Sequence, residues 1–452
     1  MNPEIRAALQ HGNAGTALAL IRALPDAQRG EFLIAAHEAN LLGRLGRHEE
    51  ELAILRRLIA EQPQNPSLHL SVANALKTLG RRDQAIAAAR DALALRPGYG
   101  KAWWVIADLK NHVFTDEDVE AMEAALVTAE TPADRLHLHF ALGRAAEQRD
   151  EAEKAFAHYA DGNAIAAAAI PPHAPRTAER VDRAIAIFTR PFFAAREGLG
   201  DPGDAPIFIV GLHRSGSTLV EQILASHPEI EATSELPILG QLMRSVAADP
   251  SLPGEAPVDK LAGLDKARAA ALGAEYLDRA AAYRLEGKPR FVDKMPANWL
   301  YTGLIRLILP NATIIDARRH PMAAGFSNFR QHYDAGASWS HSLEAIGRYY
   351  RDYLRLMRHF DMVLPGKIHR VINERLIEDF ESEVRRLLDH VGVPFDPACL
   401  EFHRSNRPVR SASAEQVRRP VNREGVDQWR KFEPWLGPLK EGLGDALEDW
   451  QQ

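Results

Sequence analysis

Residues 206–224 constrain the fold of this chain more than any other stretch. They begin with a short apolar run, residues 207–210, which predicts a buried strand. A turn containing Gly211 and Gly216 follows, and apolar residues then recur at helical spacing over residues 217–225. A strand, a glycine loop and a helix in this order direct backbone N–H groups and the positive end of a helix dipole at one point. The stretch therefore predicts a phosphate-binding loop.

This loop differs at one position from the P-loop of nucleotide hydrolases. Gly211, Gly216 and Thr218 have the Walker A spacing, but Ser217 stands where those enzymes need a lysine. The missing lysine argues against hydrolysis of ATP or GTP. Arg214 lies inside the loop instead, and its planar guanidinium suits bidentate contacts with a phosphate or sulfate oxyanion. An ordinary strand–turn–helix corner is the simpler alternative.

Size and composition restrict the rest of the chain. A chain of 452 residues is too long for one core, so two or three domains are expected. The formal net charge of −6 makes nonspecific binding to nucleic acid a poor hypothesis. The single cysteine, Cys399, permits no intrachain disulfide, suits a reducing compartment and is expected to be inert packing. With no signal pattern at the N-terminus and no apolar run of about 18 residues, we expect a cytoplasmic protein that does not engage a membrane.

The first third of the chain repeats with a period of 34 residues. Leu45-Gly46-Arg47 recurs as Leu79-Gly80-Arg81, and Pro63 recurs as Pro97, which is the period of the tetratricopeptide repeat. A more divergent unit covers residues 142–159. Three or four helix pairs stacked into a solenoid are therefore expected over residues 1–165. Such an array either binds a peptide or protein partner on its concave surface or only supports the second domain, and the sequence leaves both readings open.

Prolines and glycines mark the joint between two domains. Pro171-Pro172-His173-Ala174-Pro175 interrupts a helical pattern, helix resumes over residues 176–195, and the Gly/Pro-dense residues 198–206 are typical of a loop before a strand. We expect a repeat domain over residues 1–165, a connecting helix and linker over 166–204, and a catalytic domain over 205–452.

Strand and helix patterns alternate in the second domain. Further strands are expected over residues 290–294, 312–316 and 368–372, and helices over 265–285, 297–309, 342–360 and 376–391. This alternation predicts a parallel sheet flanked by helices, whose ligands bind beyond the carboxyl ends of the strands. Arg214, Lys294 and Arg319 all fall at the ends of predicted strands. Three cations at one rim suit a polyanionic nucleotide.

Three motifs of this chain resemble the sulfotransferase family. They are Gly211-Leu-His-Arg-Ser-Gly-Ser-Thr-Leu219, Arg319-His-Pro to Ser327, and Gln416-Val-Arg-Arg-Pro-Val-Asn422. The chain is most similar to tyrosylprotein sulfotransferases and to bacterial sulfotransferases that carry tetratricopeptide repeats. The resemblance covers about residues 205–440. It implies a P-loop-like α/β domain that uses 3′-phosphoadenylyl sulfate (PAPS) as sulfuryl donor, releases adenosine 3′,5′-bisphosphate and needs no metal.

The same resemblance implies roles for single residues. Glu235 falls where tyrosylprotein enzymes place the catalytic base, and Lys294 where they place a cation on the bridging oxygen. Ser413 aligns with a second group that stabilises the transition state, together with Arg214. The remaining contacts to the donor are implied for the 5′-phosphosulfate (Arg214, Ser215, Gly216, Ser217, Thr218), the 3′-phosphate (Arg319, Ser327) and a nucleotide-binding segment (Gln416, Val417, Arg418, Arg419, Asn422).

The chemistry of sulfuryl transfer agrees with these roles. The acceptor hydroxyl must lose its proton as it attacks, and a positioned carboxylate base accelerates such a step roughly 10²- to 10⁴-fold. Charge that grows on the leaving phosphate oxygen needs preorganised donors and cations. A phenol, with a pKa of about 10, is an easier acceptor for a carboxylate base than an alkyl alcohol. Peptidyl tyrosine, a carbohydrate and a small phenol all stay open as acceptors, and a homodimer is compatible with the sequence.

Some positions depart from the family pattern. Asn373 stands where the family often has a tyrosine, Gln428 replaces a lysine, and Gln331 stands where a further arginine is usual, for which Arg330 is a substitute. Asp316 is interpreted as structural, and Asp293 with Lys294 could form a surface ion pair. The histidines show no metal-ligand pattern, and core or surface roles are expected for His213, His320 and His332.

Two alternatives from other functional classes stay open. One is a P-loop kinase or NTPase with an unusual loop, and the other is a scaffold in which the repeats bind a partner and the sheet domain is degenerate. Magnesium-dependent ATP turnover would support the first, and absence of any nucleotide affinity would support the second.

Overall fold

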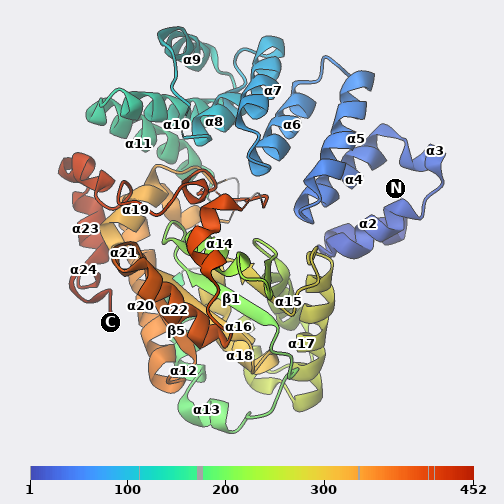
Figure 1. Cartoon of the computed structure of the whole chain (residues 1–452), viewed down its shortest axis with the longest axis vertical. Helices are drawn as coiled ribbons and strands as arrows, with labels where there is room; N and C mark the ends of the chain where they lie inside the picture. Colours follow the sequence, from blue (N-terminus) through green and yellow to red (C-terminus); the bar gives the residue numbers. More distant parts are fainter. Residues whose placement is uncertain (1, 111, 171–176, 334–335, 406, 412) are drawn as a thin grey trace.

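The protein is described from a computed structural model that covers residues 2–110, 112–170, 177–333, 336–405, 407–411 and 413–452 (Figure 1). The prolines that were predicted to interrupt the chain, Pro171 to Pro175, lie outside the described residues. An N-terminal array of helices arches over a C-terminal α/β domain (Figure 1).

The N-terminal part is built from antiparallel helix pairs, as the 34-residue period predicts. After α1 (Pro3–Gln10), α2 (Ala14–Arg22) and the short α3 (Asp26–Arg29), the pairs are α4 (Phe32–Arg44) with α5 (His48–Glu61), α6 (Pro66–Thr78) with α7 (Arg82–Leu95), α8 (Gly100–Asp108) with α9 (Asp116–Thr128), and α10 (Pro132–Gln148) with α11 (Ala152–Ala168). Gly46 and Gly80, with φ of 77° and 73°, make the equivalent turns within two of the pairs, a backbone conformation that favours glycine. The helical repeat array is therefore confirmed, and its assignment as tetratricopeptide stays a prediction.

The connecting helix belongs with the α/β domain. Helix α12 (Thr177–Ile187) packs on α20 (Leu343–Val363) and α16 (Pro257–Lys260), and the short α13 (Arg190–Ala194) follows it. Arg183 binds Asp259 at 2.8 Å, and Arg355 binds Asp182 at 2.5 Å. Helix α11 runs to Ala168, slightly past the predicted end of the repeat domain at residue 165.

The C-terminal domain contains a five-stranded parallel sheet in the order β2-β3-β1-β4-β5. The strands are β1 (Pro206–Gly211), β2 (Ile230–Ala232), β3 (Arg290–Lys294), β4 (Thr313–Arg318) and β5 (Ile368–Ile372). Alternate residues of β1 enter two separate hydrophobic clusters, Ile207 and Ile209 in one and Phe208 and Val210 in the other. A strand with a core on both faces lacks polar alternation, which explains its continuous apolar sequence.

Helices cover both faces of this sheet. One cluster joins β1 to α14 (Ser217–Ala225) and α22 (Phe380–Val391), and the other joins it to α17 (Lys266–Ala281), α18 (Thr302–Ile308) and α20. The remaining helical segments are α15 (Ile238–Ala248), α19 (Pro321–Phe329), α21 (Asn373–Glu378), α23 (Gly437–Leu443) and α24 (Ala446–Asp449), with 3₁₀ turns η1 (Leu261–Gly263), η2 (Pro296–Tyr301), η3 (Ser338–His341), η4 (Pro397–Arg404), η5 (Gln416–Arg418) and η6 (Gln428–Trp435).

The structure corrects several predicted elements. Strand β2 and helices α15 and α19 were not predicted. The helix expected over 297–309 begins as η2 and only then becomes α18, and the helix expected over 376–391 is divided by Asp379, which has φ −131° and ψ 65°. Residues 282–285 lie beyond the end of α17.

The two parts of the chain pack closely against each other. The ring of Phe156 on α11 stacks on Phe329 and Trp435, with centroids 5.7 and 5.6 Å apart. Asn163 donates a 2.7 Å hydrogen bond to the carbonyl of Phe329, and the backbone N–H of Val409 donates to the carbonyl of Thr78 at 3.1 Å. These contacts hold the helical array against the edge of the sheet where the predicted site residues lie.

Candidate active site

The predicted phosphate loop connects β1 to α14 through a turn that glycine makes possible. Gly211 has φ of 141°, and a Cβ there would lie 2.3 Å from the carbonyl oxygen of Ala317 on β4. Gly216 has φ of 92° at the start of α14, and a Cβ there would lie 2.5 Å from Oδ1 of Asn373. Both positions therefore combine a left-handed backbone with a close approach that a side chain would prevent.

The hydroxyl residues of the loop have different partners. Ser215 donates a 2.6 Å hydrogen bond to the carbonyl of Leu212, which closes the turn. The Thr218 hydroxyl contacts the Ser411 hydroxyl at 2.8 Å, and Ser217 is buried at the first position of α14. Because Ser217 stands where a Walker A loop has its lysine, the positive charges of this site come from other residues.

Arg214 is the charged centre of the loop, and its hydrogen bonds go to neutral acceptors. Its guanidinium donates to the hydroxyls of Ser327 at 3.0 Å and Ser413 at 2.6 Å, and to the amide oxygen of Gln416 at 3.4 Å. Burial, together with the positive charge of Arg330, lowers the pKa of Arg214. A partly buried guanidinium held by hydroxyls rather than by a carboxylate is suited to bind an anion.

Arg319 lies next to Arg214 and is also incompletely satisfied. It donates to the carbonyl of Arg214 at 3.1 Å and to the carbonyl of Gly425, while its buried Nε has no hydrogen-bond partner. Burial and the nearby charge of Arg214 lower its pKa to about 10. The residues of this loop thus fit a polyanionic nucleotide, since two adjacent guanidinium groups that are not hydrogen-bonded to a carboxylate favour a compensating negative charge.

The C-terminal segment closes over the loop and forms a cavity of 130 Å³ with it. Most of the residues that were predicted to bind the donor meet there, namely Arg214, Gly216, Arg319, Ser413, Gln416, Val417, Arg419 and Asn422. Asn373 and Gln428, two of the positions that depart from the family pattern, line the same cavity. The parts of the chain that supply these side chains are separated by up to about 200 residues, and the sheet brings them together.

Five predicted donor-binding residues do not line this cavity, namely Ser215, Ser217, Thr218, Ser327 and Arg418. Ser327 lines a second cavity on the other side of Arg214. Arg418 points toward the repeats instead, where its guanidinium lies against Gly80 and donates to the carbonyl of Thr78 at 3.5 Å. A contact between Arg418 and a nucleotide stays a prediction that this side-chain position does not favour.

The predicted base and the predicted cation are in direct contact. The ammonium of Lys294, at the end of β3, donates to Oε1 of Glu235 at 2.5 Å. The Lys294 side chain is 1% exposed and that of Glu235 is 39% exposed. Burial alone would raise the pKa of Glu235, but the ammonium outweighs it and holds the pKa below its usual value; the same contact raises the pKa of Lys294 against the effect of burial. The pair is therefore ionised, and the carboxylate is free of its proton.

Two residues near this pair have surroundings that the sequence analysis did not predict. His213 lies close enough to Glu235 and Lys294 to interact with them electrostatically, and burial lowers its pKa to about 4, so its ring is neutral. Asp293 does not form a surface pair with Lys294 but is fully buried, accepting hydrogen bonds from Tyr276 at 2.9 Å and from the backbone N–H of Leu236 at 3.3 Å. Burial raises the pKa of Asp293 to about 7. The surroundings of His213 and Asp293 could have been predicted only if the order of the strands in the sheet had been known.

A larger cavity of 460 Å³ opens beside Glu235. The α/β domain supplies Glu235, Ser234 and Arg410 to its wall, and the repeats supply Arg44 and His48. The cavity is thus enclosed by both parts of the chain, and its size is within the usual range for small-molecule sites.

The remaining polar residues of the sheet edge have structural partners. Asp316 accepts from Arg318 at 2.6 Å and from Tyr353, so it is engaged inside the core as expected. His320 stacks on Trp429 with centroids 5.7 Å apart, and burial raises the pKa of Cys399 to about 12. Among the residues that the structure describes, no group of three or more His, Cys, Asp or Glu side chains is arranged to hold a metal ion, and no helix is long and apolar enough to cross a membrane.

Known proteins share this region of the chain. Residues 206–397 match the Sulfotransferase family. An uncharacterized protein of Aquifex aeolicus is 31% identical over 348 residues, which cover 75% of this chain and 46% of that protein. A protein-tyrosine sulfotransferase of Drosophila melanogaster is 25% identical over 244 residues, which cover 49% of this chain and 46% of that protein. The chain thus spans about half the length of these curated relatives.

Solved structures give a more distant likeness. The sulfotransferase domain of the Synechococcus PCC 7002 olefin synthase is 24% identical, with a TM-score of 0.38, and the match covers 52% of this chain and 90% of that domain.

Proposed function

Because the chain belongs to the sulfotransferase family through residues 206–397, we propose that it transfers a sulfuryl group from PAPS to the hydroxyl of an acceptor and releases adenosine 3′,5′-bisphosphate. One observation carries the proposal. Glu235 and Lys294 form an ionised pair at the carboxyl end of the sheet, between an arginine-bearing phosphate loop and a 460 Å³ cavity. A base, a cation and an anion-binding loop are the three elements that in-line sulfuryl transfer needs.

The donor is assigned to the phosphate loop and the 130 Å³ cavity beside it. It supplies the reactive group as a sulfate ester of its 5′-phosphate, so it brings several negative charges into the site. The hydrogen bonds of Arg214 and Arg319 go to hydroxyl, amide and carbonyl oxygens, and Arg319 has an unused buried Nε. Ser215, Ser217 and Thr218 sit where the start of α14 directs backbone N–H groups toward an anion.

Glu235 acts as the general base in this proposal. Its lowered pKa keeps it ionised at neutral pH, and its 39% exposed side chain faces the cavity from which an acceptor hydroxyl would approach. Lys294 stays protonated and provides a fixed positive charge beside the reacting groups. Arg214 and Ser413, which are joined by a 2.6 Å hydrogen bond, stabilise charge on the leaving phosphate from the other side.

The acceptor is assigned to the 460 Å³ cavity. Because α4, α5 and the turn between them form part of its wall, the repeats help to present the acceptor in this proposal. Peptidyl tyrosine is the acceptor named for the Drosophila relative, and a phenol suits a carboxylate base better than an alkyl alcohol does. Carbohydrates and small phenols are the other acceptor classes to test.

Sulfate transfer from labelled PAPS to fractionated lysate, with identification of the product by mass spectrometry, tests this function. Glu235→Gln and Lys294→Met are expected to lose transfer while binding of adenosine 3′,5′-bisphosphate survives. Glu275→Gln is the matched control, because Glu275 lies on α17, binds Arg279 at 3.1 Å and lines none of the cavities of the site. Full activity in both site variants would refute the assignment. Magnesium-dependent ATP turnover would favour a kinase or NTPase instead, and absence of nucleotide binding would favour a scaffold.

A further inference from the structure

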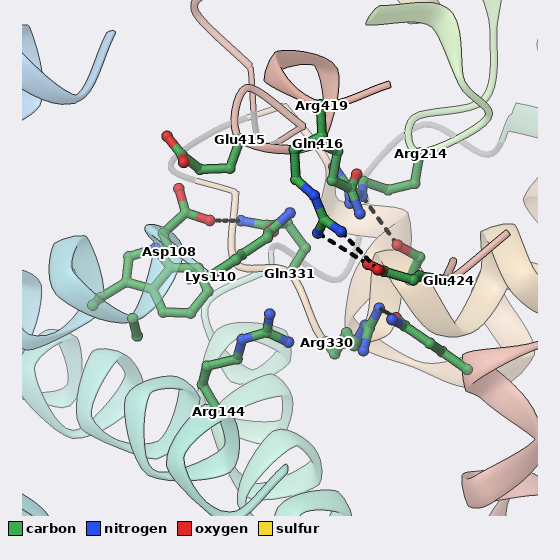
Figure 2. Close-up of a pocket in the computed structure, with 14 residues that line it drawn as sticks. Asp108, Lys110, Arg144, Arg214, Arg330, Gln331, Glu415, Gln416, Arg419 and Glu424 are labelled. Carbon is green, nitrogen blue, oxygen red and sulfur yellow. Dashed lines mark hydrogen bonds and ion pairs between the residues drawn. The ribbon is translucent and has the colours of Figure 1, made fainter. Parts of the chain in front are cut away.

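A second cavity, of 220 Å³, lies between the repeats and the α/β domain on the far side of Arg214 (Figure 2). Lys110, at the end of α8, and Arg144, on α10, enter it from the repeats. Arg214, Ser327 and Arg330 face them from the α/β domain. Figure 2 shows these cations directed toward one another across the gap between the two parts of the chain.

Positive charge exceeds negative charge in this cavity. Among the described residues that line it are five cations and three carboxylates. Asp108 is partly engaged elsewhere, since it binds Lys77 at 2.7 Å, whereas Glu424 binds Arg419 of the same cavity at 2.7 Å. Glu147 has to serve two guanidiniums, binding Arg144 at 3.0 Å and also Arg330. The described lining residues therefore include more cations than carboxylates.

The pKa of Lys110 agrees with this excess of positive charge. Burial and the charge of Arg214 lower the pKa of Lys110 far below its usual value, and Arg144 and Arg330 act in the same direction. Cations held together in a partly closed site repel each other unless an anion enters. Bringing them together is unfavourable for the free protein, and a bound phosphate would reverse that effect.

The cavity adjoins the donor site and does not include the reacting groups. Arg214, Gln416 and Arg419 line both this cavity and the 130 Å³ cavity. Glu235 and Lys294 line neither of them. A nucleotide in the 130 Å³ cavity would therefore lie beside the cationic cavity, which a phosphate remote from the reacting groups could enter.

We propose that Lys110 and Arg144 bind the 3′-phosphate of the nucleotide, so that the repeat domain completes the donor site of the α/β domain. This inference rests on the proposed function, because it takes its ligand from it. It gives the repeats a role beyond presenting the acceptor. Donor binding then joins the two domains, and the interface contacts of Arg330 with Glu147 and of Gln331 with Asp108, at 3.2 Å, hold the cations in place.

Calorimetric titration of the full chain with two nucleotides tests this role. Adenosine 3′,5′-bisphosphate carries the 3′-phosphate and adenosine 5′-phosphate lacks it. Lys110→Gln and Arg144→Gln are expected to weaken binding of the bisphosphate about tenfold or more, the size of one charge-assisted hydrogen bond, and to leave binding of the monophosphate within about twofold. Lys110→Arg should retain most of the affinity. Lys154→Gln is the matched control, because Lys154 lies on α11 outside this cavity and pairs with Glu123 at 3.0 Å.

The outcomes separate the two proposals. If the wild-type chain transfers sulfate and binds the bisphosphate but both variants bind it normally, the inference is wrong and the proposed function stands. Equal losses for both nucleotides would also overturn it, because they would indicate a general disturbance of the fold. Inorganic phosphate that binds as tightly as the bisphosphate, with the same dependence on Lys110, would assign the cavity to a free anion instead. If the wild-type chain binds neither nucleotide, the proposed function itself fails.

Discussion

The ion pair between Lys294 and Glu235 should respond asymmetrically to the loss of either partner. Lys294 is 1% exposed and Glu235 is 39% exposed, although the two side chains are in contact at 2.5 Å. Glu235→Gln removes the carboxylate that is hydrogen-bonded to this buried ammonium and leaves Glu221 as a more remote negative charge near it. Lys294→Met leaves a carboxylate that water can reach, and it replaces the lysine stem with an apolar side chain of similar length.

The magnitude follows from these exposures. Breaking a fully buried ion pair costs about 3–5 kcal/mol because one charge is left uncompensated. Water at the exposed part of Glu235 screens this pair, and the glutamine oxygen still accepts a hydrogen bond, so we expect Glu235→Gln to cost about 2 kcal/mol. We expect Lys294→Met to cost less than about 1 kcal/mol. The double variant should recover most of the stability lost in Glu235→Gln, since it no longer contains the unpaired ammonium.

Urea unfolding of the three variants and the wild-type chain measures these differences as shifts of the unfolding midpoint. Activity gives the complementary reading, because the double variant is expected to regain stability without regaining transfer. The reasoning would be refuted if Lys294→Met were as destabilising as Glu235→Gln, or if the effects of the two substitutions simply added.

Three further predictions concern the same site. In Lys294→Met the ammonium no longer opposes the effect of burial on Glu235, so the pKa of Glu235 rises. The acidic limb of the pH–rate profile for any residual transfer activity should therefore move to higher pH. An unchanged acidic limb would contradict the assignment of Glu235 as the base. The pKa of Asp293 rises to about 7 on folding, so this residue stabilises the fold most at low pH and loses that contribution as the pH rises from about 4 to 7. The unfolding free energy of the wild-type chain should therefore fall over this range by an amount on the order of 4 kcal/mol, and Asp293→Asn should flatten that fall. Parallel curves of unfolding free energy against pH for the two proteins would argue against this prediction. Gly216→Ala places a Cβ 2.5 Å from Asn373 at a residue with φ of 92°, so it should weaken nucleotide binding, measured by calorimetry, at least about tenfold. Gly98→Ala is the control and should bind the nucleotide normally, because no atom lies within 4 Å of its new Cβ.

Local sequence patterns predicted the elements that carry their own signals. Strand β3, strand β5 and helix α14 after the glycine loop have the predicted bounds. Each has apolar residues at strand or helical spacing between turn or charged residues. The three-residue β2 was missed, since so short a strand has no periodicity and exists only through its pairing with β3. The break at Asp379 was missed because the apolar spacing continues across it.

The site required tertiary information that no local pattern contains. Glu235 and Lys294 are 59 residues apart in sequence, and their contact follows from the adjacency of β2 and β3 in the sheet. The positions of Arg418 and Lys110 depend on how the repeats pack on the α/β domain, for which the 34-residue period gives no orientation. The resemblance to sulfotransferases indicated which residues to consider, while their partners and charge states come from the structure.

Incubation of the purified chain with PAPS and an acceptor fraction, with separate quantification of the sulfated product and of adenosine 3′,5′-bisphosphate, tests the central claim most directly. The account predicts that the two products form in equal amounts with the wild-type chain and that Glu235→Gln forms neither, although it still binds adenosine 3′,5′-bisphosphate. Nucleotide release without a sulfated product across all acceptor classes, or equal product formation by Glu235→Gln, would contradict it.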